Sequence, residues 1–186
     1  MITDETDSLT ENKTQKKRGL GYYWPFGFAV GIFALDQFTK WLTENNLGPY
    51  GSGNQAEILG GLVIFRYVKN TGASFSILQN SPWFFALVAS LASIGIIIWY
   101  VTRGTTDCWY QFCVALLLAG AVGNLSDRLF KNGAVTDMIN LPWAEIFKNF
   151  NVADVSLNVG VATLLLVTIF RSLRENRDNS TKSDNI

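Results

Sequence analysis

The sequence of 186 residues contains no histidine. This absence excludes a Ser-His-Asp triad, a Cys-His pair and a zinc ion held by imidazole rings. Cysteine is scarce too, since Cys108 and Cys113 are the only two in the chain. They are five residues apart and do not share a helix face, so no disulfide framework is indicated and we expect two buried, unreactive thiols.

Long apolar stretches are abundant. Hydrophobic residues make up 48% of the chain and aromatic residues 13%, which a purely soluble protein would have to place in an unusually aromatic core. Residues 82 to 101 include no charged side chain, and about twenty apolar residues suffice for a helix to cross the hydrocarbon layer. Residues 22 to 41, 109 to 125 and 155 to 170 are also compatible with spanning, the last helix starting earlier, near residues 151 to 154. We therefore predict an all-α membrane protein with four transmembrane helices.

The basic residues predict the orientation, because lysine and arginine near span ends are retained in the cytoplasm. The tails and the loop between spans two and three hold Lys13, Lys16, Lys17, Arg18, Arg103, Arg171, Arg174, Arg177 and Lys182. The opposite loops hold only Arg66, Lys69, Lys131 and Lys148. Both termini are thus expected in the cytoplasm. The first span follows a long charged tail and contains Asp36 and Lys40, so we expect it to be retained rather than cleaved as a signal peptide.

One membrane domain, residues 22 to 174, is expected between two polar cytoplasmic tails, 1 to 21 and 175 to 186, predicted to be disordered. Residues 44 to 81 and 131 to 153 form the outside segments. The first is glycine-rich at its start and alternates in part over residues 61 to 68, which predicts a small extracytoplasmic β-hairpin or sheet at the membrane surface.

Polar residues within the spans are costly and are usually paired or functional. Asp36 and Lys40 are four residues apart on one helix face, so they form an ion pair or present a lysine to a substrate or active-site group. Asn124 and Asp127 also share a face, with Arg128 beside them. Two interpretations of these three residues stay open: an arginine-carboxylate pair that holds two helices together, and a functional polar cluster.

Two further carboxylates lie at the outer side. Asp137 stands between apolar neighbours and is either a solvated loop charge or a functional group. Asn151 precedes Asp154 by three residues, a capping arrangement that would also keep a catalytic carboxylate ionised at a helix N-terminus. Ala119 and Gly123 form a small-xxx-small pair that permits close helix approach, and the Asn-Thr-Gly at residues 70 to 72 favours a turn.

Four separated motifs, taken together, resemble the lipoprotein signal peptidase (signal peptidase II) family over residues 35 to 160. They are D-Q-x-x-K at 36 to 40, N-T-G-A-x-F-S at 70 to 76, G-x-x-G-N-x-x-D-R at 120 to 128 running on to V-x-D at 135 to 137, and F-N-x-A-D at 150 to 154. Each motif is modest alone, but their order and the four-span pattern are specific. Met138 replaces the family's usual phenylalanine, Ser74 an alanine and Ala119 a glycine, and none of these changes a carboxylate.

The resemblance implies an aspartyl endopeptidase at the outer face of the cytoplasmic (inner) membrane. It implies cleavage just before a diacylglyceryl-modified cysteine, without metal or cofactor, by Asp137 and Asp154. The supporting or substrate-binding residues that it implies are Asp36, Lys40, Asn70, Gly120, Asn124, Asp127, Arg128, Asn151 and Ala153. The family pattern, not the residue chemistry, selects Asp137 over Asp127. The expected partners are lipid-modified prolipoproteins and membrane lipids, with no nucleic acid, and a monomer is expected.

Two apposed aspartates share one proton, so the ionised member can take a proton from water while the protonated member polarises the scissile carbonyl. Asp154, at a helix N-terminus, is favoured as the ionised one. Three other interpretations stay open: a Ser-Lys peptidase using Lys40 with Ser74 or Ser76, a small transporter with a polar pathway along its helices, and a structural scaffold. Candidates to line a groove for acyl chains are Phe33, Phe38, Phe75, Trp83, Phe84 and Phe85.

Overall fold

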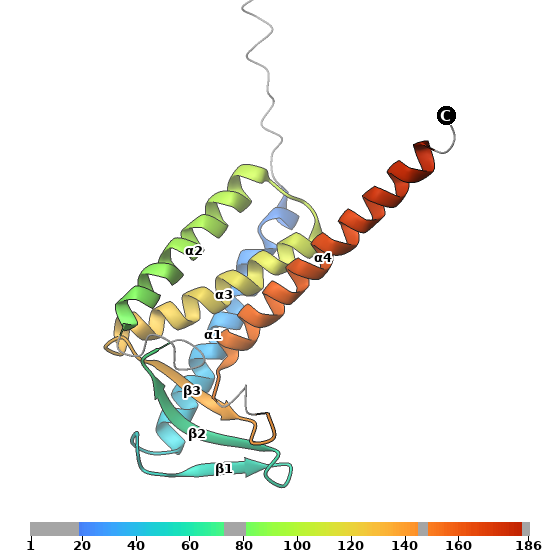
Figure 1. Cartoon of the computed structure of the whole chain (residues 1–186). Helices are drawn as coiled ribbons and strands as arrows, with labels where there is room; N and C mark the ends of the chain where they lie inside the picture. Colours follow the sequence, from blue (N-terminus) through green and yellow to red (C-terminus); the bar gives the residue numbers. More distant parts are fainter. Residues whose placement is uncertain (1–18, 73–80, 145–148, 184–186) are drawn as a thin grey trace, which may run out of the picture.

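The computed structural model describes residues 19 to 72, 81 to 144 and 149 to 183, and helices dominate it (Figure 1). The elements in chain order are η1 (Leu20–Tyr22), α1 (Trp24–Asn46), β1 (Gln55–Ile58), β2 (Val63–Asn70), α2 (Pro82–Arg103), α3 (Cys108–Phe130), β3 (Val135–Asn140) and α4 (Val152–Ser183).

Three helices in the described part of the chain are long and apolar enough, by length and composition, to cross a membrane: Trp83–Arg103, Cys108–Phe130 and Val152–Ser180. They coincide with the second, third and fourth predicted spans, and α4 begins at Val152, close to the expected start. The first predicted span is the helix α1, but Asp36, Gln37 and Lys40 lower its hydropathy. A fourth span therefore stays a prediction.

Helix α3 is central and packs against α1, α2 and α4. Its small side chains allow this, since Ala115 and Ala119 are buried against Ala29 of α1. Towards α4 the fit is tighter: a Cβ added to Gly120 would lie 2.5 Å from the carbonyl oxygen of Ala153. Gly123 faces both neighbours, because an added Cβ would meet Asp36 and Ala153 at 2.9 and 3.0 Å. The predicted close helix approach is confirmed.

Aromatic and amide groups lock the end of the bundle that lies away from the sheet. Tyr22 and Tyr100 stack with their ring centroids 4.7 Å apart. The buried Gln111 of α3 donates to the Tyr100 hydroxyl over 3.0 Å and accepts from the Trp24 ring nitrogen over 2.6 Å. These contacts tie α1, α2 and α3 together beside a small apolar cluster that includes Val114.

An antiparallel three-stranded sheet, in the order β1-β2-β3, covers the other end of the bundle (Figure 1). Strands β1 and β2 form the predicted hairpin, with Gln55 opposite Arg66 and Ile58 opposite Val63. The third strand comes from the second outside segment and was not predicted as a strand. It pairs with β2 so that Val68 lies opposite Asp137 and Lys69 opposite Thr136.

Two expectations need correction. Cys113 is buried, but Cys108 is exposed because it is the first residue of α3, beyond the packed part of the helix. Residues 175 to 183, expected to be disordered, continue α4 as a helix. This extension places arginines four residues before acidic side chains, Arg171 before Glu175 and Arg174 before Asp178, a spacing that supports helix. Residues 1 to 18 and 184 to 186 of the predicted tails lie outside the described residues.

Candidate active site

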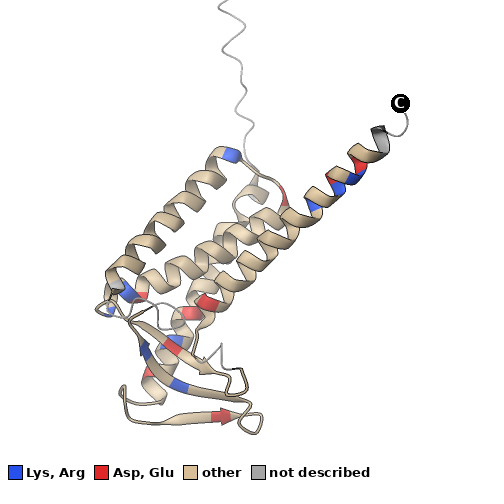
Figure 2. Ribbon diagram, viewed as in Figure 1, with Lys and Arg blue, Asp and Glu red and all other residues tan. Residues whose placement is uncertain are grey.

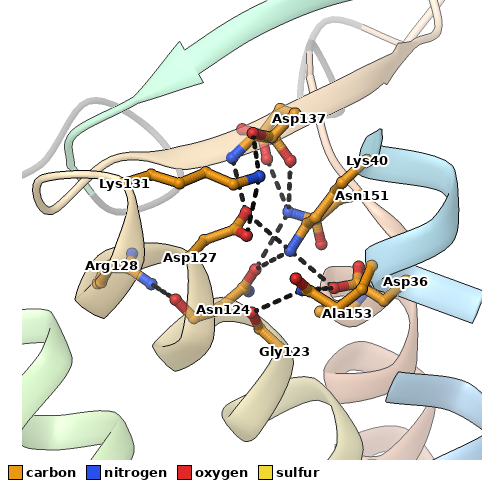
Figure 3. A network of polar contacts seen from close by, with 12 residues as sticks. Asp36, Lys40, Gly123, Asn124, Asp127, Arg128, Lys131, Asp137, Asn151 and Ala153 are labelled. Carbon is orange, nitrogen blue, oxygen red and sulfur yellow. Dashed lines mark hydrogen bonds and ion pairs between the residues drawn. The ribbon is translucent and has the colours of Figure 1, made fainter. Parts of the chain in front are cut away.

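A cluster of buried polar side chains lies where α1, α3 and α4 meet the sheet (Figure 3). It brings together the polar residues predicted for the aspartyl peptidase site, and the predicted Gly120 lies beside it, where α3 contacts Ala153. Less than a tenth of the surface is exposed in Asp36, Lys40, Asn124, Asp127, Arg128, Asp137, Asn151 and Ala153. Buried polar groups are costly unless they are hydrogen-bonded or ion-paired, so the partners of each side chain decide what the cluster can do.

Asp137 lies on β3 with only 1% of its surface exposed. The alternative of a solvated loop charge is wrong, because β3 pairs with β2 and is packed against the helix ends. Two asparagines hold the carboxylate: Asn151 Nδ2 donates to Oδ1 over 2.8 Å, and Asn70 Nδ2 donates to Oδ2 over 3.0 Å. Both oxygens are therefore fixed in direction.

Asp154 stands in the first turn of α4 and is half-buried. Its backbone N–H donates to Asn151 Oδ1 over 2.9 Å, and its Oδ2 accepts from the Asn151 N–H over 3.3 Å. This reciprocal cap confirms the predicted capping arrangement. The other oxygen, Oδ1, accepts from Asn124 Nδ2 over 2.8 Å. The carboxylate thus sits at the positive end of a helix.

Asn151 connects the two carboxylates, since its side chain binds Asp137 and its backbone N–H binds Asp154. Burial raises the pKa of Asp137 to about 7, and the charge of Asp154 adds to the increase. The amides of Asn70 and Asn151 and the charge of Lys40 oppose it. A carboxyl that keeps a proton near neutral pH therefore lies in one hydrogen-bonded cluster with a second carboxyl, a combination suited to acid-base chemistry.

Lys40 of α1 lies between two carboxylates, and its Nζ is 2.7 Å from Asp36 Oδ2 and 3.1 Å from Asp127 Oδ2. The predicted Asp36–Lys40 ion pair is confirmed. The second oxygen of Asp36 accepts from the Ala153 N–H over 2.8 Å. Gly123 makes room for Asp36, because any side chain there would collide with the carboxylate. The Lys40 ammonium is thus engaged by carboxylates, whereas a Ser-Lys base needs a neutral amine next to a serine.

Arg128 does not form the expected pair with Asp127. Its guanidinium donates to the carbonyl oxygens of Asn124 and Gly72 over 3.2 and 3.4 Å and lies over the Phe85 ring, 5.5 Å from the centroid. Asp127 instead forms ion pairs with two lysines, Lys40 and Lys131. Gly72 belongs to the predicted turn, whose Asn70 Oδ1 accepts from the Gly72 N–H over 3.0 Å. The rest of that motif, residues 73 to 76 with Ser74 and Ser76, lies outside the described residues.

Three members of the wider network were missed from the sequence: Glu44, Lys131 and Thr136. Lys131 Nζ lies 2.6 Å from Glu44 Oε1 and 3.1 Å from Asp127 Oδ1. The four-residue spacing that singled out Asp36 and Lys40 continues to Glu44, and Asp127 has the same spacing to Lys131. Extending that pattern by one turn would have found both residues, whereas nothing in the sequence indicates Thr136.

Comparisons with known proteins agree on one family. The family model described as Signal peptidase (SPase) II matches residues 28 to 170. A lipoprotein signal peptidase of Symbiobacterium thermophilum is 37% identical over 139 residues, which cover 74% of this chain and 89% of that protein. A lipoprotein signal peptidase of Listeria monocytogenes is 37% identical over 151 residues, 80% of this chain and 93% of that protein.

Solved structures support the same fold. One described as a bacterial membrane enzyme at 2.3 Å resolution matches with a TM-score of 0.73 and 26% identity, covering 80% of this chain and 89% of that one. Another, described in the same way at 1.9 Å, matches with a TM-score of 0.69 and 27% identity, covering 78% of this chain and 92% of that one.

Proposed function

This chain belongs to the signal peptidase II family, a family of multi-pass bacterial membrane proteases that cleave lipoprotein signal peptides, and we propose that it works as an aspartyl endopeptidase with Asp137 and Asp154 as its catalytic pair. The substrate is a diacylglyceryl-modified prolipoprotein, cut immediately before the lipidated cysteine. No metal or cofactor takes part.

The observation that carries this proposal is the pair of carboxylates joined through Asn151. Hydrolysis of an amide requires a base for water and an acid for the carbonyl oxygen and the leaving nitrogen. Two carboxyl groups supply both functions if one holds a proton and the other does not. The asparagines that hold Asp137 and Asp154 direct their oxygens without adding a charge, so the proton stays with the pair.

The roles follow from the two environments. Asp137 is buried in the sheet and favours its protonated form, so it donates to the scissile carbonyl oxygen. Asp154, at the N-terminus of α4, is the ionised member and takes a proton from the attacking water. When the tetrahedral intermediate collapses, Asp154 passes that proton to the leaving nitrogen, while Asp137 takes a proton back from a hydroxyl of the intermediate, which becomes the new carboxyl group. Asp137 is then protonated and Asp154 ionised, as at the start. General acid-base assistance of this kind contributes about 10²- to 10⁴-fold to the rate.

The membrane arrangement supports an outer active site. We propose that α1 is a fourth span, because its charges Asp36 and Lys40 are enclosed by protein and do not face lipid. Arg103 ends α2, and the basic residues of α4 follow residue 170, at the end of the bundle away from the sheet (Figure 2). With basic residues retained inside, both termini are cytoplasmic and the catalytic pair lies at the outer face.

Exposed apolar faces of the helices suit the lipid part of the substrate, to which each buried CH₂ contributes about 0.8 kcal/mol. Among the proposed groove residues, Phe38, Trp83 and Phe84 are largely exposed. Phe33 and Phe85 are half-buried, and Phe75 lies outside the described residues. We expect the enzyme to act as a monomer.

The test uses purified full-length protein and a lipidated precursor, with an unlipidated precursor for comparison. Asp137→Asn and Asp154→Asn should each abolish release of the signal peptide, which a gel shift detects. Asp107→Asn is a matched control, because that carboxylate caps the start of α3 and pairs with Arg171, remote from the cluster. Substantial cleavage by either dyad variant would remove the basis of the mechanism, and cleavage of the unlipidated precursor would remove the substrate assignment.

A further inference from the structure

Five side chains of alternating charge form a ladder between α1 and the end of α3. Its members in order are Glu44, Lys131, Asp127, Lys40 and Asp36. The successive nitrogen-oxygen distances are 2.6, 3.1, 3.1 and 2.7 Å. Figure 3 shows how Asp127 lies between the two lysines. Each charge is compensated by its neighbours, so the ladder is a connected unit rather than a set of separate ion pairs.

The ladder also holds the backbone next to each catalytic aspartate. Asp36 accepts from the N–H of Ala153, the residue before the α4 aspartate, over 2.8 Å. Asp127 accepts from the N–H of Thr136, the residue before the β3 aspartate, over 2.9 Å. One ladder therefore connects the two chain segments whose relative position sets the distance between the carboxylates.

The outer end of the ladder is built around Thr136. Its hydroxyl donates to Glu44 Oε1 over 2.6 Å and accepts from Lys131 Nζ over 3.0 Å. Successive side chains of a strand point to opposite faces, so the Thr136 side chain points away from the face that carries Asp137. Glu44, Lys131 and Thr136 thus hold β3 through the face opposite to Asp137, and their side chains do not contact the catalytic pair.

This outer triad borders a cavity of about 200 Å³, which Tyr67, Lys69, Asn132 and Ala134 also line. The side chains of Glu44 and Lys131 are about 30% and 29% exposed. Burial disfavours the charge of Lys131, but the hydrogen bond that its ammonium donates to Glu44 and the charge of Asp127 outweigh burial and raise the pKa of the ammonium. Lys131 therefore stays charged across the working pH range.

We propose that Glu44, Lys131 and Thr136 are positioning residues of the peptidase, which fix β3 so that its aspartate meets the aspartate of α4 in the productive geometry. The inference rests on the proposed function, because it assigns a role only if the two aspartates are the catalytic pair. The side chains of these residues bind one another and Asp127 rather than Asp137 or Asp154, so this role predicts an effect on the chemical step and not on substrate binding.

Kinetics of the purified full-length enzyme with a lipidated precursor test this role. A small displacement of a catalytic group reduces the rate strongly, so Glu44→Gln, Lys131→Met and Thr136→Val should each lower kcat about ten-fold while KM changes less than about two-fold. Thr136→Ser keeps the hydroxyl and should restore most of the rate. Glu57→Gln is the control, since it makes the same chemical change at an exposed residue of β1, and should behave as the unmodified enzyme.

Thermal unfolding of each variant shows whether the fold is retained. If Thr136→Val does not fold, Glu44→Gln carries the test, because that change is made at a partly exposed residue. Unchanged kcat in Glu44→Gln, an effect on KM alone, or equal losses in Thr136→Ser and Thr136→Val would each overturn the proposal. Failure of the proposed function looks different: Asp137→Asn and Asp154→Asn would then still cleave the precursor.

Discussion

Replacing Asp137 with asparagine should abolish cleavage and, at alkaline pH, stabilise the fold. The folded protein raises the pKa of this carboxyl from 3.8 to about 7, mainly by burial. Between these two values the folded state holds a proton that the unfolded state has lost. The stability that this proton contributes is fully present below pH 3.8 and is lost as the pH rises through about 7.

The size of the effect follows from the shift. One pKa unit corresponds to about 1.4 kcal/mol, so the full shift of about three units disfavours the folded state by about 4 kcal/mol at pH 8. Between pH 5 and pH 8 the folded protein loses about 3 kcal/mol of stability through this carboxyl. Asparagine has the shape of the protonated acid and cannot ionise. At pH 5 the unmodified protein has already lost about 1 kcal/mol of stability through this carboxyl, and one imperfect hydrogen bond to Asn70 or Asn151 costs the variant about the same, so the two proteins should be about equally stable there.

The assay is chemical denaturation of the purified protein in detergent at pH 5 and pH 8, with the cleavage assay on the same preparations. We expect a smaller pH dependence of the free energy of unfolding in Asp137→Asn, and a more stable variant at pH 8. Asp107→Asn, which changes a carboxylate far from the cluster, should keep the pH dependence of the unmodified protein. A variant less stable at pH 8, or one with an unchanged pH dependence, would refute the claim that burial in the sheet keeps this carboxyl protonated.

Three further predictions concern the reaction and the packing. The rate at low substrate concentration should fall as the pH rises through about 7, because Asp137 then loses the proton that it donates; a flat profile between pH 6 and 9 would contradict this. EDTA should leave cleavage unchanged, because two carboxyl groups supply both acid and base; strong inhibition would show that a metal takes part. Gly120→Ala should destabilise the fold by about 1–3 kcal/mol, because the new Cβ would lie 2.5 Å from the Ala153 carbonyl oxygen. Gly95→Ala, where that Cβ meets nothing within 4 Å, should not, and equal thermal stability of the two variants would contradict the close packing of α3 on α4.

Several features of this protein were predictable from local patterns. Twenty residues without charge form a helix long enough to cross a membrane, and α2, α3 and α4 appear where the apolar stretches predicted them. The hairpin of β1 and β2 and the reciprocal cap of Asn151 and Asp154 were also predictable. These features depend on neighbours within a few residues, so the sequence order itself encodes them.

The environment of Asp137 was not predictable in this way. Its neighbours in the sequence allow a solvated loop charge as well as a catalytic group, and chemistry alone does not prefer it to Asp127. The partners that distinguish the two aspartates come from distant segments. Asn70 is 67 residues from Asp137 and binds it, whereas Lys40 and Lys131 hold Asp127 in ion pairs.

The sequence by itself determined the apolar helices, the hairpin, the caps and the set of polar residues available for chemistry, because periodicity, turn preference and charge act over short distances. Only the tertiary structure decided which carboxylate is engaged by lysine and which is held by asparagine. Burial and charge pairing depend on which segments pack together in three dimensions. In this protein the addition of β3 to the sheet brings Asp137 to Asn151, and the glycines of α3 let α4 bring Asn151 and Asp154 into the same cluster.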